Sequence, residues 1–514
     1  MHDDSTGALA NPAVLDDENL SESFPGPCAP ITRDVILRIY PPLARTLARS
    51  AGLPEPASPV VFHEGRAFYS VSSLSNLLRI GPSVARKLLL PTVSFRPALR
   101  SLWPLIRDLT STLRKVEDRE IEFIRELDSF LKNERDRFET VREWNELRDS
   151  LLPFIDETRR RFEPTLQIDI LALFLDDFYR WLGRTPQVRS DPLTASCLRS
   201  MRHLRNTINQ DSSARDYLLS CAGTGHYSPA MLRLRNDDIA HLLNDFLDEF
   251  GDRCPGELKL ETRSYREYPE LFLPVLLGGN EPKKASPENQ STRGWIPNWL
   301  ERKFASLLSF RQSSRWMRAR AFGVLRERLL KMGSLLEETG AVESREDVFF
   351  FHLEELVRME SAEGKHRDLV MDRRVIHFDQ GEITVAGRLR ADGRGNWAPE
   401  SDTGTPAVLG LNSVTQPMEG EVLLVPREDL IQETPESIRG KILVMHAAGP
   451  GLVHLLPWVG GLISETGSAL SHASILCREF GIPVIYGAKG ALEKLRSGQR
   501  VRCSPGSRII QPIG

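Results

Sequence analysis

The 514 residues of this chain exceed what one hydrophobic core normally organises, so we expect two to four domains. Hydrophobic residues make up 40% and charged residues 27%, which is typical of a water-soluble globular protein. A formal net charge of −3 predicts no nucleic-acid partner and no anionic membrane surface. The six cysteines contain no Cys-x-x-Cys pair, which favours reduced thiols in a cytoplasm over a disulfide framework or zinc site.

The first thirty residues are acidic and rich in proline, and they lack the basic and apolar regions of a signal peptide. We expect residues 1–30 to form a flexible lead-in. The apolar stretch Leu166–Leu182 contains three aspartates and an arginine, which argues against a membrane span and favours a buried helix. The sequence therefore predicts a cytoplasmic protein with no membrane partner.

Helical patterns dominate from Ile31 to about Asn280 and resume over Trp299–Leu336. We therefore expect a mostly helical domain over residues 31–385. Residues 279–294 (GNEPKKASPENQSTRG) interrupt it with the composition of a linker or surface loop.

Two segments of this domain have more specific patterns. Apolar residues recur among dense, mixed-sign charges over Leu105–Phe162, which is typical of a helix with a solvated charged face. Phe62–Tyr69 predicts a short hairpin with its turn at Glu64-Gly65.

The pattern changes after a second Gly-, Asp- and Pro-rich break, which we interpret as a linker over residues 386–405. Residues 406–514 alternate short apolar runs with glycines and two short helical segments, which predicts a compact α/β domain. The expected strands are Val422–Val425, Ile442–His446, Leu462–Ser464, Val484–Tyr486 and Val501–Cys503.

A small-residue loop in this α/β domain delivers His472 to the expected start of a helix, which Gly481-Ile482-Pro483 ends. Ser471 stands where an N-cap residue would be, and Gly467 and Ser468 are small enough for close approach of a ligand. A group carried on a largely neutral imidazole there would face free N–H donors and the positive end of the helix dipole. These residues favour a phosphorylated histidine over a metal ligand, with a purely structural histidine as the alternative.

The segment GSALSHASILCREFGIP resembles the signature GG-x-x-SH-x-AI-x-ARE-x-GIP of the phosphohistidine swivelling domain of PEP-utilising enzymes. It departs from that signature at Ser468, Ser474 and Cys477. In this family the histidine takes a phosphoryl group from a nucleotide or from PEP, and the domain swings to carry it to a second site. The resemblance implies that His472 is the catalytic phosphocarrier and that Gly467, Ser468 and Ser471 support the phosphate.

The helical part resembles the substrate-binding region of rifampicin phosphotransferase and PEP synthase-like proteins, on three local patterns. These are ITRDVILRIYPPLARTLARSAGL with GRAFYSVSSLSNLLR, then FLDEFGDRCPGELKLETRSYREYPE, and finally REDVFFFHLEELVRM. The resemblance implies a mainly α-helical substrate-binding-like domain followed by a C-terminal α/β (β/β/α) phosphohistidine swivelling domain.

Arg253 and Arg311 are candidates for binding substrate or the phosphoryl group, because a guanidinium fork matches phosphate geometry. Glu257 is a candidate because it follows the turn signal Pro255-Gly256, and turn residues often line sites. The alternative for each is a structural salt bridge or a solvated helix face, and Arg315 is better explained in that way. Asp252 stands where the family usually has histidine, and Gln312 where it often has glutamate.

No G-x-x-x-x-G-K-[ST] loop occurs, and neither an ATP-grasp domain nor a PEP-binding barrel is recognisable. We expect no cofactor and no metal site on this chain, with ATP and Mg²⁺ on a separately encoded ATP-grasp partner. The predicted function is that of a phosphotransferase component that passes a phosphoryl group to a small organic acceptor, with secondary metabolism as one setting. The alternative is a non-catalytic binding or regulatory protein that keeps the fold without phosphoryl transfer.

Overall fold

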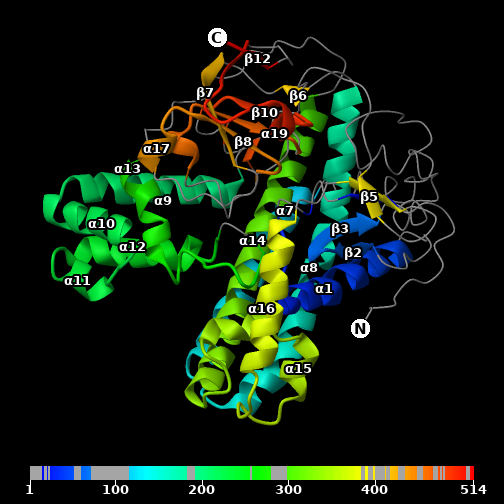
Figure 1. Ribbon diagram of the computed structural model, residues 1–514, viewed down its shortest axis with the longest axis vertical. Helices are drawn as coiled ribbons and strands as arrows, with labels where there is room; N and C mark the ends of the chain where they lie inside the picture. The colour runs from blue at the N-terminus through cyan, green and yellow to red at the C-terminus, as the bar shows by residue number, and fades with distance from the viewer. Residues whose placement is uncertain are drawn as a thin grey trace.

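The long helix α14 (Asn298–Glu338) forms the axis of the molecule in this computed structural model (Figure 1). Other helices flank α14, and a C-terminal sheet lies near one of its ends (Figure 1). The structure describes residues 14–16, 20, 23–50, 59–70, 115–181, 191–254, 258–278, 298–383, 388–391, 397–399, 411–412, 417–425, 435–448, 455–466, 473–474, 477, 481–504 and 510–513.

Two groups of helices make up the N-terminal part and confirm its mainly helical character. In the first group, α7 (Val116–Glu139), α8 (Trp144–Trp181) and η2 (Arg345–Phe350) pack against α14, α1 (Pro30–Ser50) and α15 (Leu353–Arg358) pack on α8, and α16 (Arg367–Glu382) packs on η2. The second group projects to one side (Figure 1) and comprises α9 (Pro192–Asn209), α10 (Ser212–Thr224), α11 (Pro229–Arg233), α12 (Asp237–Phe250), η1 (Pro269–Leu271) and α13 (Leu273–Gly278).

Side-chain caps fix the starts of four helices in the second group. The capping side chains accept a hydrogen bond from a backbone N–H in the first helical turn, which satisfies one of the free donors there. These caps are Asp191 for α9, Asp211 for α10, Ser228 for α11 and Asn236 for α12.

A five-stranded sheet in the order β2-β3-β1-β4-β5 lies beside α1 (Figure 1). Its strands are β1 (Val14–Asp16), β2 (Val60–His63), β3 (Arg66–Ser70), β4 (Arg388–Ala391) and β5 (Trp397–Pro399). The predicted hairpin is confirmed, because β2 and β3 pair across Glu64 and Gly65, whose φ angles of 47° and 71° are those of a tight hairpin turn.

The sequence suggests a flexible lead-in over residues 1–30 and a linker over residues 386–405. Parts of both segments are instead strands of this sheet. Val14–Asp16 pairs with both β3 and β4, and Trp397–Pro399 extends the sheet from β4. Strands of three or four residues are too short to show a clear alternation of apolar and polar positions, so the sequence pattern missed them.

The C-terminal part contains a seven-stranded sheet in the order β12-β11-β7-β8-β9-β10-β6. Its strands are β6 (Leu411–Asn412), β7 (Met418–Leu424), β8 (Ile442–Met445), β9 (Gly461–Ser464), β10 (Val484–Tyr486), β11 (Arg500–Cys503) and β12 (Gln511–Pro512), with short helices α17 (Pro435–Ile438), η5 (Leu456–Trp458) and α19 (Ala491–Lys494). All five predicted strands are confirmed. Because β7, β8, β9 and β10 run parallel, their carboxyl ends meet at one edge.

One buried apolar cluster joins this sheet to the second helical group. Phe246 and Phe272 contribute from the helices, Leu443 and Trp458 from the sheet and its connections, and Trp316 from α14. The C-terminal domain is therefore docked on the helical part through a shared core.

A row of polar contacts connects α7 to α14, two helices that run parallel at a nearly constant sequence offset. We call this row the α7–α14 seam. Its contacts are Glu117–Lys303, Glu120–Ser309 and Glu120–Ser313, Asp128–Arg320, Glu134–Arg328, Arg135–Glu327 and Lys331 to the Phe138 carbonyl. The interpretation of the charged α7 pattern as a solvated face holds for its exposed charges, such as Glu117 and Glu122. It is wrong for the buried Glu120 and for the half-buried Asp128, Glu134 and Arg135, which contact α14.

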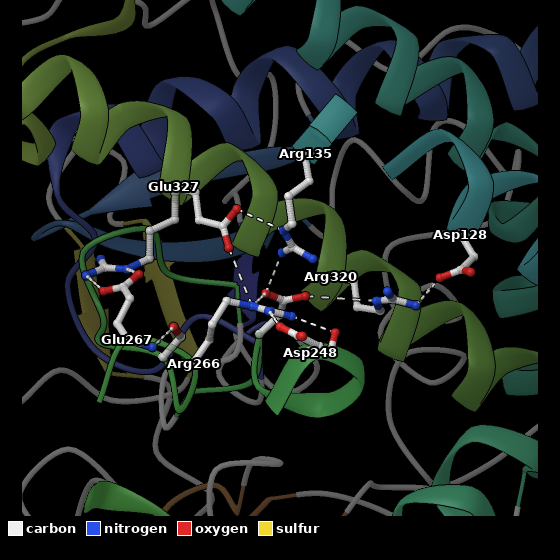
Figure 2. A network of polar contacts seen from close by, with 10 residues as sticks. Asp128, Arg135, Asp248, Arg266, Glu267, Arg320 and Glu327 are labelled. Carbon is white, nitrogen blue, oxygen red and sulfur yellow. Dashed lines mark hydrogen bonds and ion pairs between the residues drawn. The ribbon is translucent and has the colours of Figure 1, made fainter. Parts of the chain in front are cut away.

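Asp252 lies in an ionic network next to this seam, close to three guanidinium groups. Figure 2 shows Arg135, Arg266, Arg320 and Glu327 of this network. Its Oδ1 accepts hydrogen bonds from Arg135 at 2.7 Å and Arg266 at 2.9 Å. Arg320 Nε lies 3.9 Å from Oδ2, and Glu327 holds both Arg135 and Arg266. The side chain of Asp252 is only 3% exposed, so these guanidinium groups supply the neutralisation that water cannot.

Replacing Asp252 by alanine should destabilise the protein strongly, because it leaves Arg135 and Arg266 buried with too few counter-charges. Loss of one partner of such a network typically costs about 3–5 kcal/mol. Asp248 is the matched control, since its side chain also binds Arg266 but is 73% exposed. Asp248→Ala should cost about 1 kcal/mol or less in urea unfolding followed by fluorescence. Equal losses in the two variants would contradict this account of the network.

Candidate functional site

The site begins at the carboxyl ends of β8 and β9, where His446 and Glu465 follow adjacent parallel strands. Glu465 Oε2 lies 3.0 Å from His446 Nδ1, and Oε1 accepts a hydrogen bond of 3.0 Å from the Leu492 amide at the start of α19. The Thr466 amide and hydroxyl both donate to the His446 carbonyl at 2.9 Å. These bonds fix the base from which the loop after β9 leaves the sheet.

The loop residues Gly467, Ser468, Ser471 and His472 lie outside the part of the chain that the structure describes. Their roles therefore stay predictions. Gly467 follows directly on Thr466, so the loop leaves the sheet from the edge that His446 and Glu465 form.

The predicted end of the helix after His472 is confirmed. Ala473 and Cys477 are helical and buried, and Gly481 has a left-handed φ of 66°. The Ile482 amide donates to the Cys477 carbonyl at 2.7 Å, which is the six-to-one bond of a glycine-terminated helix. Glycine is required at position 481 because a Cβ would strain this conformation.

The helix that follows His472 packs into the same core as the Arg253–Trp316 stack. Ala473 and Cys477 belong to the apolar cluster that contains Trp316. The Arg253 guanidinium lies 3.4 Å from the centre of the Trp316 ring, and Trp316 Nε1 donates to Thr194 Oγ1 at 2.8 Å. Arg253 is only 4% exposed, so the ring covers a cation in the interior.

The structure places the other predicted binding residues in different surroundings. Arg311 Nε lies 3.6 Å from Asp169 Oδ1 on α8, and Asp169 also binds Arg318 at 2.6 Å. Arg253 thus contacts the stretch of α14 on which Arg311 lies. The two guanidinium groups face different neighbours, Trp316 for Arg253 and Asp169 for Arg311. Glu257 lies outside the described residues.

Three further residues on or beside α14 are buried. Arg315 is 7% exposed, which excludes a solvated helix face and leaves the structural salt bridge of the two alternatives given for it. Asp252 contributes no uncompensated charge to a substrate site, because the buried network neutralises it. Gln312, which is 2% exposed, lies on the same stretch of α14 as Arg311.

Two further histidines lie next to open cavities. His352 is the N-cap residue of α15, and its Nδ1 lies 3.0 Å from Asp34 Oδ2 beside a cavity of about 1030 Å³. His226 lines a cavity of about 720 Å³ with Tyr227 and Tyr268. Within the described ranges, no three His, Cys, Asp or Glu side chains gather as a metal site requires.

Glu120 is a candidate residue that the sequence analysis did not single out. Its Oε1 accepts hydrogen bonds from the hydroxyls of Ser309 at 2.9 Å and Ser313 at 2.7 Å. Burial raises the pKa of Glu120 from 4.5 to about 7, and the negative charges of Asp191 and Glu117 add to the rise while the two serines oppose it. This carboxyl can therefore gain or lose a proton near neutral pH.

Glu120, His446 and Glu465 could have been recognised from the sequence by their positions in the apolar pattern. Val116, Glu120, Phe123, Leu127 and Leu131 follow the spacing of one buried helix face, so Glu120 occupies a position that is otherwise apolar. His446 and Glu465 are polar residues directly after apolar strands, where parallel sheets commonly place their sites.

Family comparisons agree with this architecture. Residues 438–505, which contain the His472 loop, match the family model described as PEP-utilising enzyme, mobile domain. Residues 170–333, which include α9–α13 and most of α14, match the rifampicin phosphotransferase fourth domain. The resemblance of this chain to the PEP-utilising enzymes is thereby confirmed.

Individual relatives carry related names. The chain is 22% identical over 287 residues to rifampicin phosphotransferase of Bacillus subtilis (strain 168), covering 50% of this chain and 33% of the relative. It is 25% identical over 289 residues to the Streptomyces sviceus protein of the same name, covering 50% and 32%. An uncharacterised Mycobacterium tuberculosis (strain H37Rv) protein is 28% identical over 261 residues, covering 49% and 29%. The chain spans about a third of the length of these curated relatives.

No helix in the described part of the chain combines the length and the apolar character that a membrane crossing requires.

Glu465→Ala should loosen the base of the His472 loop, because it removes the contacts to both His446 and the Leu492 amide. Loss of hydrogen bonds to a charged group such as this carboxylate typically costs about 1.5–3 kcal/mol. Hydrogen exchange measured by mass spectrometry should show faster exchange at Thr466 and Leu492. Glu493→Ala is the control, since Glu493 is exposed on the same short helix. Unchanged exchange in Glu465→Ala would show that other contacts hold the loop base.

The raised pKa of Glu120 predicts a pH-dependent stability. The folded state binds this proton more tightly than the unfolded chain, so the free energy of unfolding falls as the pH rises from about 4.5 to about 7. The full shift corresponds to about 3 kcal/mol at most. Glu120→Gln should therefore be more stable than the wild type at pH 8 and similar at pH 4, in urea unfolding. A constant difference across that range would refute the assigned pKa.

Proposed function

We propose that this protein is a phosphotransferase component in which His472 carries a phosphoryl group. The group comes from ATP with Mg²⁺ bound on a separately encoded ATP-grasp protein, and it passes to a small organic acceptor. The observation that carries the proposal is the match of residues 438–505 to the mobile domain, together with the Ser471-His472 pair inside it. The names of the curated relatives support phosphoryl transfer as the reaction class.

The geometry around the loop supports a histidine that carries a charged group. The loop starts at the carboxyl edge of a parallel sheet, where ligands are commonly bound. The helix after His472 has a defined end at Gly481, so its first turn is the place where N–H donors remain free for an anion.

The docked position of the C-terminal domain supports an acceptor site near α14. The helix after His472 shares a core with Trp316, and Arg253 stacks on the same ring. In this arrangement a phosphoryl group on His472 would be delivered toward the second helical group and α14. We place the acceptor there, with Arg253 and Arg311 as candidates for charge neutralisation and Glu257 retained from the sequence.

The proposed transfer is an in-line displacement. The acceptor oxygen forms a bond to phosphorus while the bond from phosphorus to the ring nitrogen breaks, and the nitrogen keeps that electron pair. Little covalent chemistry is left for the protein, so positioning and charge neutralisation supply most of the rate.

Phosphorylation of His472 tests this proposal directly. The protein is incubated with [γ-³²P]ATP, Mg²⁺ and candidate ATP-grasp proteins, and the label should be stable in base and labile in acid. His472→Ala should abolish the label, whereas Glu493→Ala should keep it, because Glu493 is an exposed residue of α19 outside the proposed phosphate site. Label that persists in His472→Ala would refute the site, and absence of label with every candidate partner would refute the carrier role.

A further inference from the structure

Glu120 is an exception within the α7–α14 seam. Three other carboxylates of α7 that reach α14 pair with a cation there: Glu117 with Lys303, Asp128 with Arg320, and Glu134 with Arg328. Glu120 is 5% exposed and receives only the hydroxyls of Ser309 and Ser313, both on Oε1. Among the described residues, no side chain donates a hydrogen bond to its Oε2 and no cation pairs with it.

Burying a carboxyl without a cation is costly, so a sequence that only needed to hold two helices together would not favour it. Its neighbours increase the cost. Asp191, at the start of α9, is 1% exposed, and its negative charge and that of Glu117 both disfavour ionisation of Glu120. Glu120 is therefore a carboxyl that can exchange its proton, whereas the three carboxylates of the seam that pair with cations stay ionised.

Glu120 contacts the part of α14 where we place the acceptor site. Ser309 and Ser313 lie on the stretch of α14 that also carries Arg311, Gln312 and Trp316. Trp316 connects that stretch to Thr194 on α9 and to Arg253. Asp191 caps the same end of α9 through the Thr194 amide at 2.9 Å. Glu120 thus approaches the proposed site from the α7 side.

Residues 309–320 of α14, SFRQSSRWMRAR, contain several basic groups and no carboxylate. A hydroxyl that attacks phosphorus must lose its proton, and guanidinium groups cannot take it at neutral pH. The base must therefore come from another element. We propose that the carboxylate of Glu120 accepts the proton of the hydroxyl group that attacks phosphorylated His472, with Ser309 and Ser313 as positioning residues.

The step is balanced. The acceptor oxygen bonds to phosphorus, its proton moves to Glu120, and the bond from phosphorus to the protonated imidazole breaks with its electron pair staying on the ring nitrogen. The products are a phosphate monoester, a neutral imidazole and a neutral carboxylic acid. A base that is half ionised near pH 7 suits this role, and the acceptor it selects is a neutral alcohol or phenol. The assignment rests on His472 as the carrier.

The test separates loading from transfer. The protein is loaded chemically with phosphoramidate, freed of reagent, and incubated with glycerol as the hydroxyl probe while acid-labile phosphate and glycerol phosphate are measured. The wild type should transfer faster as the pH rises from 6 to 8. Glu120→Gln should load equally, transfer roughly 100-fold more slowly, and lose that pH dependence. Glu122→Gln, on the exposed face of the same helix, should behave as the wild type.

A structural role predicts a different pattern. The double variant Ser309→Ala and Ser313→Ala loosens the carboxylate but keeps it, so the rate should fall while the pH dependence persists with a shifted midpoint. Equal rates in the wild type and Glu120→Gln would overturn the assignment of Glu120, as would a wild-type rate no faster than that of the urea-unfolded phosphoprotein. Failure of His472 to load in any variant would instead overturn the proposed carrier function.

Discussion

Neutralisation of buried guanidinium groups on α14 is the constraint on which the helical part of this structure depends. Arg320, Arg326 and Arg328 are 8%, 3% and 1% exposed, and an unpaired charge at such depth would cost several kcal/mol. Carboxylates from α7 and from the segment after α12 supply the counter-charges, and the rings of Phe138 and Phe154 cover Arg328. These requirements fix the parallel register of α7 against α14.

The same constraint organises the surroundings of the proposed acceptor site. Towards one end of α14 the charges are paired and the helices are held rigidly. At residues 309–316 hydroxyl and aromatic contacts join the ion pair of Arg311 with Asp169, and there the second helical group and the C-terminal domain meet α14 through Trp316. A rigid ionic frame beside a less neutralised layer is a suitable support for chemistry that moves a charged group, because the frame holds positions while the layer can change its protonation.

Prediction from sequence succeeded where the signal is local. Five strands of the C-terminal sheet, the Glu64-Gly65 hairpin and the helix end at Gly481 all follow from short-range patterns and turn chemistry. It failed where a partner far along the chain decides. Val14–Asp16 carries too little pattern to be recognised as a strand, and it pairs with β4 across more than 370 residues. Trp397–Pro399 pairs with the nearby β4, which itself is held in the sheet by the distant β1.

The sequence by itself determined the two classes of domain, the family resemblance and the identity of the carrier histidine as a prediction, because signature spacing and periodicity are properties of neighbouring residues. Only the tertiary structure decided which charges are buried. In the sequence, Asp252 is an altered site residue and nothing more. The structure places Arg135, Arg266 and Arg320 beside it, and Figure 2 shows these three arginines together. Glu120 became distinct for the same reason. The free energy of a charge depends on its partners and its access to water, and both are set by segments distant in sequence.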